Sequence, residues 1–175
     1  MRNFGDDALR VSDTTIPVGL PTAYVLIGVQ ASGKSTWASA NASRLGAVVL
    51  ASDAIRNELA AQGKEAEAED GDAVFAIFNR RLAELLQEGR NVISDATHAR
   101  RAWRRAEIDL GRSLAARLIG VWFDVPLEEC LLRNTRRAGQ AWGDRTVPED
   151  YLRQVAAGFE EPQAGEFDEV WRIGG

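Results

Sequence analysis

The residues best suited to chemistry form the run Gly28-Val29-Gln30-Ala31-Ser32-Gly33-Lys34-Ser35, which fits the pattern G-x-x-x-x-G-K-[ST]. Glycines at these positions let backbone N–H groups converge on phosphate oxygens without interference from a Cβ atom. The side chain of Lys34 would reach the β- and γ-phosphates, and the Ser35 hydroxyl would ligate Mg²⁺. A flexible glycine turn with no ligand is the alternative, so the flanking elements decide between the two.

Those flanking segments favour the phosphate site. Residues 24–27 are apolar and partly β-branched, which is typical of a buried strand. Residues 36–45 are rich in alanine and serine and predict a helix that ends near Gly46. Strand, glycine loop and helix in this order predict a site for ATP, or another nucleoside triphosphate, with Mg²⁺ or a similar divalent ion. The expected nucleotide-binding residues of the loop are Gly28, Gln30, Ala31, Ser32, Gly33, Lys34, Ser35 and Thr36.

A second pair of candidates follows the next predicted strand, residues 47–50. Asp53 is a candidate general base that accepts the proton of an incoming hydroxyl. Arg56, one helical turn later, would hold an anionic part of the substrate. The alternative is that Asp53 only caps the helix that starts at Ser52-Asp53.

A third group follows the predicted strand at residues 91–94. Asp95, at its tip, is a candidate for holding the Mg²⁺ shell together with Ser35, or else a cap of the next helix. Thr97 and His98 come directly after it and are candidates for contact with the acceptor substrate. His98 is the only histidine, so it predicts no metal cluster.

Arginines supply most of the positive charge near these motifs, with ten arginines and no lysine between residues 100 and 145. On a predicted helix at residues 99–110, with Trp103 facing the core, Arg100 and Arg104 lie on the flank and are candidates for substrate contact. Arg133 and Arg137 are four residues apart and share a helix face. With Arg145 they predict a lid at about residues 133–147 that closes over the triphosphate and stabilises charge on the transferring phosphoryl group. Arg137 and Arg145 are therefore also expected to bind the nucleotide. Solvated surface arginines are the alternative.

The elements around these motifs predict a single α/β domain over residues 23–175, preceded by an N-terminal extension at residues 1–22. Five predicted strands alternate with helices, which indicates a five-stranded parallel sheet with helices on both faces and an arginine-bearing lid. The remaining segments are an exposed acidic connection at 61–71, a helix through Val74, Phe78, Leu82 and Leu85 that stops at Gly89, a strand at 118–123, helices after Pro126 and Pro148, and a last strand at 169–173.

Composition sets further bounds. The chain has 175 residues, a net charge of −5 and ordinary globular hydrophobicity, so nothing in the overall charge indicates a nucleic-acid binder. Its one cysteine, Cys130, excludes an internal disulfide and is expected to be a small core residue in a cytoplasmic protein. No signal peptide is expected in the first residues, and no run approaches the ~18 apolar residues of a membrane span.

The order of these motifs resembles the polynucleotide 5′-hydroxyl kinase family, especially the kinase domain of bacterial and phage end-healing RNA-repair enzymes. The resemblance rests on the loop at 28–36, Ser52-Asp53-x-x-Arg56, Asp95-Ala96-Thr97, Arg104 and the arginines at 133, 137 and 145. It implies a P-loop kinase that transfers the ATP γ-phosphate to a 5′-OH of RNA or DNA. It also implies that Asp53 is the general base, that Arg56 engages the acceptor and that the three later arginines belong to the lid. This chain has His98 where that family usually has asparagine.

Three functions are therefore open. The leading one is a stand-alone polynucleotide kinase, in which Arg56, Arg100 and Arg104 would line an open groove. The second is a kinase of a small hydroxylated molecule, which a closed acceptor pocket would favour. The third is a nucleotide-binding switch without catalysis. The sequence does not indicate the oligomeric state.

Overall fold

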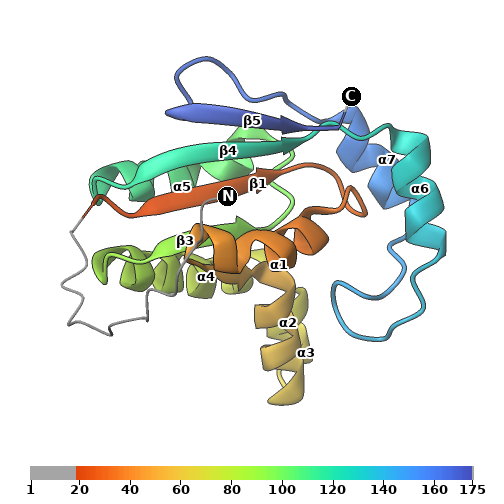
Figure 1. Cartoon of the computed structure of the whole chain (residues 1–175). Coiled ribbons are helices and arrows are strands. Elements are labelled where there is room, and N and C mark those ends of the chain that lie inside the picture. Colours follow the sequence, from red (N-terminus) through yellow and green to blue (C-terminus); the bar gives the residue numbers. More distant parts are fainter. Residues whose placement is uncertain (1–18, 175) are drawn as a thin grey trace, which may run out of the picture.

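The computed structural model describes residues 19–174, so most of the predicted N-terminal extension, residues 1–18, lies outside the described residues. Its centre is a five-stranded parallel sheet with the strand order β2-β3-β1-β4-β5 (Figure 1). This confirms the predicted single α/β domain with a parallel sheet. The strands are β1 (Thr22–Ile27), β2 (Ala47–Ala51), β3 (Asn91–Asp95), β4 (Arg117–Phe123) and β5 (Glu169–Ile173).

Helices cover both faces of the sheet. Helix α1 packs on one face, and α4 and α5 pack on the other (Figure 1). Helices α6 and α7, with the loop between them, lie on the side toward which the strands point. The helices are α1 (Lys34–Leu45), α2 (Ser52–Ala61), α3 (Glu65–Glu69), α4 (Gly71–Gln87), α5 (Arg101–Ser113), α6 (Leu127–Thr135) and α7 (Glu149–Ala157).

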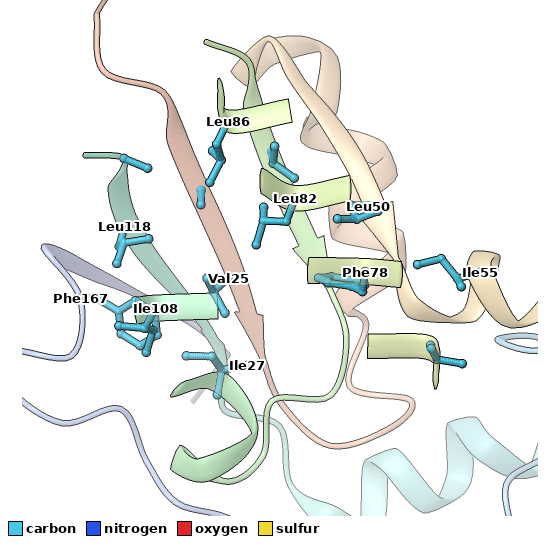
Figure 2. Packing of buried hydrophobic residues seen from close by; sticks show 14 of the residues in the cluster. Val25, Ile27, Leu50, Ile55, Phe78, Leu82, Leu86, Ile108, Leu118 and Phe167 are labelled. Atoms are coloured by element: carbon cyan, nitrogen blue, oxygen red, sulfur yellow. The ribbon is translucent and has the colours of Figure 1, made fainter. Parts of the chain in front are cut away.

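Strand β1 is buried on both faces because it lies in the middle of the sheet. Val25 and Ile27 face the core under α4 and α5, where Phe78, Ile108 and Phe167 pack (Figure 2). Tyr24 and Leu26 face the opposite core under α1. The alternation explains why the strand reads as a continuous apolar run.

Two segments differ from the sequence prediction. The acidic connection at 61–71 contains a short helix, α3, because Ala68 is only 1% exposed and anchors it to the core. Helix α4 buries Leu86 rather than Leu85 as its last full core residue, and Asp70 caps its start by accepting from Asp72 N at 2.9 Å. Within residues 19–174, no helix combines the length and the apolar character that crossing a bilayer requires.

Candidate nucleotide and phosphoryl-transfer site

One large cleft lies beyond the carboxyl ends of β1, β2 and β3 and continues under the α6–α7 loop. It encloses about 1980 Å³, more than the ~300–1,000 Å³ of a typical small-ligand pocket. Parallel pairing explains its position, because β1 and β3 are neighbours and both deliver their following loops to this edge. The cleft has room for a nucleotide and a second substrate.

The glycine loop after β1 has the backbone that its sequence predicts. Gly33, with φ +99°, directly precedes α1. At Gly28 a Cβ atom would lie 2.8 Å from Ser32 Oγ and 3.0 Å from Phe123 Cβ, so no larger residue fits. Gly28 N donates to the carbonyl of Thr97 at 3.2 Å, which joins the loop to the segment after β3.

Lys34 is the first residue of α1 and is 8% exposed. Its ammonium group donates to the carbonyls of Gly28 at 2.9 Å and Val29 at 2.7 Å. Burial lowers the pKa of Lys34 to about 8, and the negative charge of Asp95 opposes that shift only in part. A buried ammonium that lacks a full countercharge suits an anionic ligand.

Three further features of the loop fit a triphosphate and its metal ion. The first N–H groups of α1 have no acceptor inside the helix and point toward an anion at its N-terminus. Ser32 Oγ is buried without a hydrogen-bond partner among the described residues, and its hydroxyl can donate to a phosphate oxygen. Ser35 and Thr36 are exposed and line the cleft. The loop thus offers donors for phosphate and a hydroxyl for its metal.

Asp95 ends β3 beside the glycine loop, and its side chain lines the cleft. It does not cap a helix, because α5 begins six residues later with Arg100 as its N-cap. Residues 19–174 contain no group of three or more His, Cys, Asp or Glu residues able to enclose a metal ion. Asp95 and Ser35 both line the cleft and would hold a Mg²⁺ ion whose remaining ligands would be phosphate oxygens and water.

Asp53 lies in the first turn of α2, lines the cleft and is half-buried. It does not cap the helix, because Ala51 is the N-cap and no side chain bonds to that end. Burial raises the pKa of Asp53 and the Asp95 carboxylate raises it further, while Arg56 opposes the shift. A carboxylate with a raised pKa beside the phosphate loop can accept a proton from a hydroxyl.

Arg56 also lines the cleft, and its Nη1 donates to the carbonyl of Ala68 at 2.5 Å. Its guanidinium carbon lies 4.7 Å from the ring centre of Trp142, which belongs to the α6–α7 loop. Arg56 is thus held between α3 and the lid, one turn after Asp53.

The three arginines predicted to belong to a lid occupy different places. Arg133 donates to the carbonyl of Ser32 at 3.2 Å and pairs with Glu129, so it joins α6 to the glycine loop. Arg137 lies just past the end of α6 and lines the cleft. Its charge adds to the lowering of the pKa of Lys34 by burial and opposes the burial that raises the pKa of Asp53. Arg145 stacks on the lid's own tryptophan, with its guanidinium carbon 3.3 Å from the ring centre of Trp142.

The structure does not bring Arg104 to the cleft. Its side chain is fully buried and Trp103 is 42% exposed, which reverses the orientation expected for this helix. Arg104 satisfies its charge internally, because it pairs with Glu166 at 2.8 and 3.0 Å and donates to three carbonyls. These carbonyls belong to His98, Glu160 and Glu161, at 3.0 to 3.2 Å.

Two more residues predicted to contact the substrate have side chains engaged elsewhere, although His98 is among the residues that line the cleft. Arg100 does not line the cleft; its guanidinium lies over Trp103 at 5.2 Å and next to Gly158. The His98 ring is fully buried, and both of its nitrogens are occupied, by Leu26 O and by Glu107. Thr97 does line the cleft, where its hydroxyl accepts from Gln30 Nε2 at 3.4 Å.

Sequence reasoning also missed Asn57, Trp142 and Gly143, which join α2 to the lid. Asn57 exchanges two hydrogen bonds with the backbone of Trp142, and Gly143 lies against the Asp53 carboxylate. The available signal was a tryptophan inside a polar, glycine-containing loop. Cys130 is fully buried, as predicted, and burial raises the pKa of its thiol.

Solved structures with this fold include several kinases. A protein described as a candidate kinase from Chloroflexus aurantiacus matches with a TM-score of 0.72 and 17% identity over 89% of this chain and 88% of that one. A gluconokinase from Sinorhizobium meliloti matches with a TM-score of 0.61 and 19% identity over 88% and 82%. In the Pnkp1/Rnl/Hen1 RNA repair complex, one chain matches with a TM-score of 0.67 and 22% identity over 79% of this chain but only 44% of its own length.

At these identities the solved structures establish a P-loop kinase-like fold and leave the acceptor open. No curated protein matches the sequence. The AAA domain model, in contrast, matches residues 24–162, which contain the glycine loop, Asp53, Asp95 and the lid. The chain therefore belongs to the AAA_33 family of AAA domains.

Proposed function

We propose that this protein is an ATP-dependent kinase that transfers the γ-phosphoryl group to a hydroxyl held beside Asp53. One observation carries the proposal: Lys34, Asp95 and Asp53 from three different elements line one cleft, and the charges of Lys34 and Asp95 both act on the pKa of Asp53. A site that only binds nucleotide has no need of a second, half-buried carboxylate on the acceptor side.

Each residue has a separate task in the transfer. Lys34 and the N–H groups of the glycine loop would hold the β- and γ-phosphates, and Ser35 and Asp95 would hold Mg²⁺, which neutralises phosphate charge when bound. Asp53 would take the proton of the acceptor hydroxyl. The hydroxyl oxygen would then bond to the γ-phosphorus while the bond between that phosphorus and the bridging oxygen of ADP breaks. Arg133, Arg137 and Arg145 would stabilise the charge on the transferring group.

For the acceptor, we favour a small hydroxylated molecule over a nucleic-acid strand. Of the three arginines expected to line a strand-binding groove, Arg56 lines the cleft, whereas Arg104 is internal and Arg100 lies elsewhere. The lid also covers the space beside Asp53, where Gly143 approaches its carboxylate. A covered acceptor site suits a molecule that enters whole.

A 5′-OH end of RNA or DNA is the second candidate. Arg56, one turn after Asp53, could take the first phosphodiester, and Trp103 and Tyr151 are 42% and 48% exposed on the cleft wall. Exposed aromatic rings beside a basic residue are typical stacking sites for single-stranded nucleic acid.

The deciding experiment measures transfer of labelled γ-phosphate from ATP with Mg²⁺. The acceptors are 5′-OH RNA and DNA oligonucleotides and a panel of sugars, sugar acids, amino sugars and other small alcohols. Asp53→Asn is the matched control, because it keeps the side-chain shape and removes the base; we expect it to lower turnover by about 10²–10⁴-fold without weakening ATP binding.

Label on a small molecule, lost in Asp53→Asn, would support the proposal. Label on the oligonucleotides alone would establish the second candidate instead. ATP binding without transfer to any acceptor would overturn the kinase and favour a nucleotide switch.

A further inference from the structure

The lid loop between α6 and α7 is fastened at two points by asparagine side chains. At its base, Asn134 Nδ2 donates to Val147 O at 2.8 Å and Asn134 Oδ1 accepts from Val147 N at 3.0 Å. At its tip, Asn57 Nδ2 donates to Trp142 O at 3.1 Å and Asn57 Oδ1 accepts from Trp142 N at 2.8 Å. The first pair closes the loop on itself, whereas the second joins it to another element, α2.

At the tip, the Trp142 indole contacts two arginines. One lies on the acceptor side of the proposed reaction and the other belongs to the lid. Arg56 belongs to α2 and to the acceptor side, and its guanidinium carbon is 4.7 Å from the ring centre. Arg145 belongs to the lid, and its guanidinium carbon is 3.3 Å from the same ring centre. Both distances are within the range of a cation–π contact. The indole therefore fixes the direction of both guanidinium groups.

Gly143 brings the lid backbone to the candidate base. It has φ +89°, and a Cβ atom there would lie 3.3 Å from Asp53 Oδ2. A side chain would press on the carboxylate, and the left-handed backbone also favours glycine. When the tip is bound to Asn57, the lid therefore covers Asp53 without displacing it.

We propose that Asn57 and Trp142 form a clasp that positions Arg56 and Arg145 together and closes the acceptor site over Asp53. The inference rests on the proposed kinase function. Transfer requires the acceptor hydroxyl and the γ-phosphate to be aligned at the same time, and α2 and the lid carry the groups for the two sides. The clasp is the contact that holds α2 and the lid in one fixed relative arrangement. Both residues act through the arginines and are positioning residues.

The clasp predicts a specific kinetic pattern. Asn57→Ala and Trp142→Ala should each lower kcat by about tenfold to hundredfold and raise KM for the acceptor, because displaced groups lose alignment. The dissociation constant of a non-hydrolysable ATP analogue should change by less than about threefold, because Lys34 and the glycine loop are untouched. Trp142→Phe keeps the backbone bonds and an aromatic face and should recover most of the activity. The double variant Asn57→Ala/Trp142→Ala should be no worse than the poorer single variant, because the two residues act as one unit.

A second measurement, hydrogen exchange, tests the clasp without relying on catalytic activity. Hydrogen exchange of the segment 138–147 should speed up in Asn57→Ala, because the Trp142 N–H loses its acceptor. Leu132→Ala, an exposed apolar residue of α6, is the control and should change neither kcat nor exchange. Thermal unfolding of every variant separates a local effect from loss of the fold.

Unchanged exchange in Asn57→Ala, or additive losses of kcat in the double variant, would overturn the clasp. If the wild-type protein phosphorylates none of the acceptors, the proposed function fails, and the exchange experiment still decides whether the lid tip is bound to α2. The two failures are therefore distinguishable.

Discussion

Burial shifts the two most important ionisable residues of the cleft toward their neutral forms. The pKa of Lys34 falls to about 8 because its ammonium group is buried, and the pKa of Asp53 rises chiefly because its carboxyl group is desolvated. Each residue thus becomes more sensitive to a charged partner. In the proposed reaction, a triphosphate next to Lys34 would restore the positive charge of its ammonium group, and the proton of the acceptor hydroxyl would neutralise Asp53.

The affinity for ATP should fall as the pH rises through about 8, because free Lys34 loses its proton there and the triphosphate needs the charged form. Between about pH 7.5 and about pH 9.5 we expect the dissociation constant to rise by at least about tenfold. Near pH 8, where half of the free Lys34 side chains are deprotonated, binding should take up about half a proton per nucleotide. Calorimetric titration with a non-hydrolysable ATP analogue, in two buffers of different ionisation enthalpy, measures both effects.

Asp53→Asn is the control for this titration, because it removes the other cleft residue whose pKa is shifted, and the pH dependence of binding should persist without it. A dissociation constant that stays flat from about pH 7.5 to about pH 9.5 would show that Lys34 does not titrate there.

At the scale of elements, a buried polar network joins β3, α5 and β1, the strand that precedes the glycine loop. His98 Nδ1 lies 2.8 Å from Leu26 O, and His98 Nε2 lies 2.5 Å from Glu107 Oε1. Ser94 donates to the other oxygen of Glu107. A carbonyl oxygen only accepts, so Nδ1 carries a proton, and one further proton is held between Nε2 and Glu107. The network holds the segment that follows Asp95 and bonds to Gly28.

Burial disfavours the charged imidazolium, but the charge of Glu107 and its hydrogen bond outweigh burial, and the pKa of His98 is raised. The stabilisation from this pair is therefore complete below the unfolded-state value of 6.5 and is lost as the pH rises through the folded-state pKa.

His98→Ala should lower the free energy of unfolding by about 3–5 kcal/mol near neutral pH, because it leaves the Glu107 carboxyl buried without its charged partner and with only the Ser94 hydrogen bond. Urea unfolding at several pH values measures the difference, which should shrink at high pH. The exposed pair Arg105–Asp109 is the matched control, and Arg105→Ala should cost less than about 1 kcal/mol. A loss as small as the control's would mean that water reaches Glu107 and that the network is not tightly closed.

These elements also show where sequence reasoning succeeds. The strands and the phosphate loop were predictable, because apolar runs and the spacing of Gly28, Gly33 and Lys34 are local signals. Arg104 was not, because its charge is satisfied by Glu166 and by carbonyls about sixty residues away in the sequence. The Asn57–Trp142 contact spans 85 residues and leaves no periodic pattern. Local patterns therefore located the edge of the sheet that carries the candidate site but not the long-range contacts around it.

For the whole molecule, the candidate site lies at the edge of the sheet where the strands end, with the loop between α6 and α7 among the segments that line it. The sheet is buried by α1 on one side and α4 and α5 on the other, so the fold does not depend on the cleft being filled. A nucleotide bound to the folded state alone stabilises the whole domain by mass action. At a hundred times its dissociation constant this amounts to about 2.7 kcal/mol, or roughly 5–10 °C in Tm for a domain of this size.

Lys34→Met should separate stability from function in one substitution. The folded protein lowers the pKa of Lys34 from 10.5 to about 8, so its buried charge opposes folding most strongly below pH 8, and this opposition fades between those two values. Methionine fills similar space without a charge. We therefore expect the free variant to have a Tm no lower than the wild type at pH 7, with the advantage shrinking toward pH 10.

The same variant should lose the Tm increase from a non-hydrolysable ATP analogue, because no point charge meets the β- and γ-phosphates. Differential scanning calorimetry with and without the analogue measures both quantities, and Arg105→Ala should keep the increase. A lower Tm for the free variant would mean that the two carbonyl contacts of Lys34 outweigh its desolvation, and a retained ligand shift would remove Lys34 from the nucleotide site.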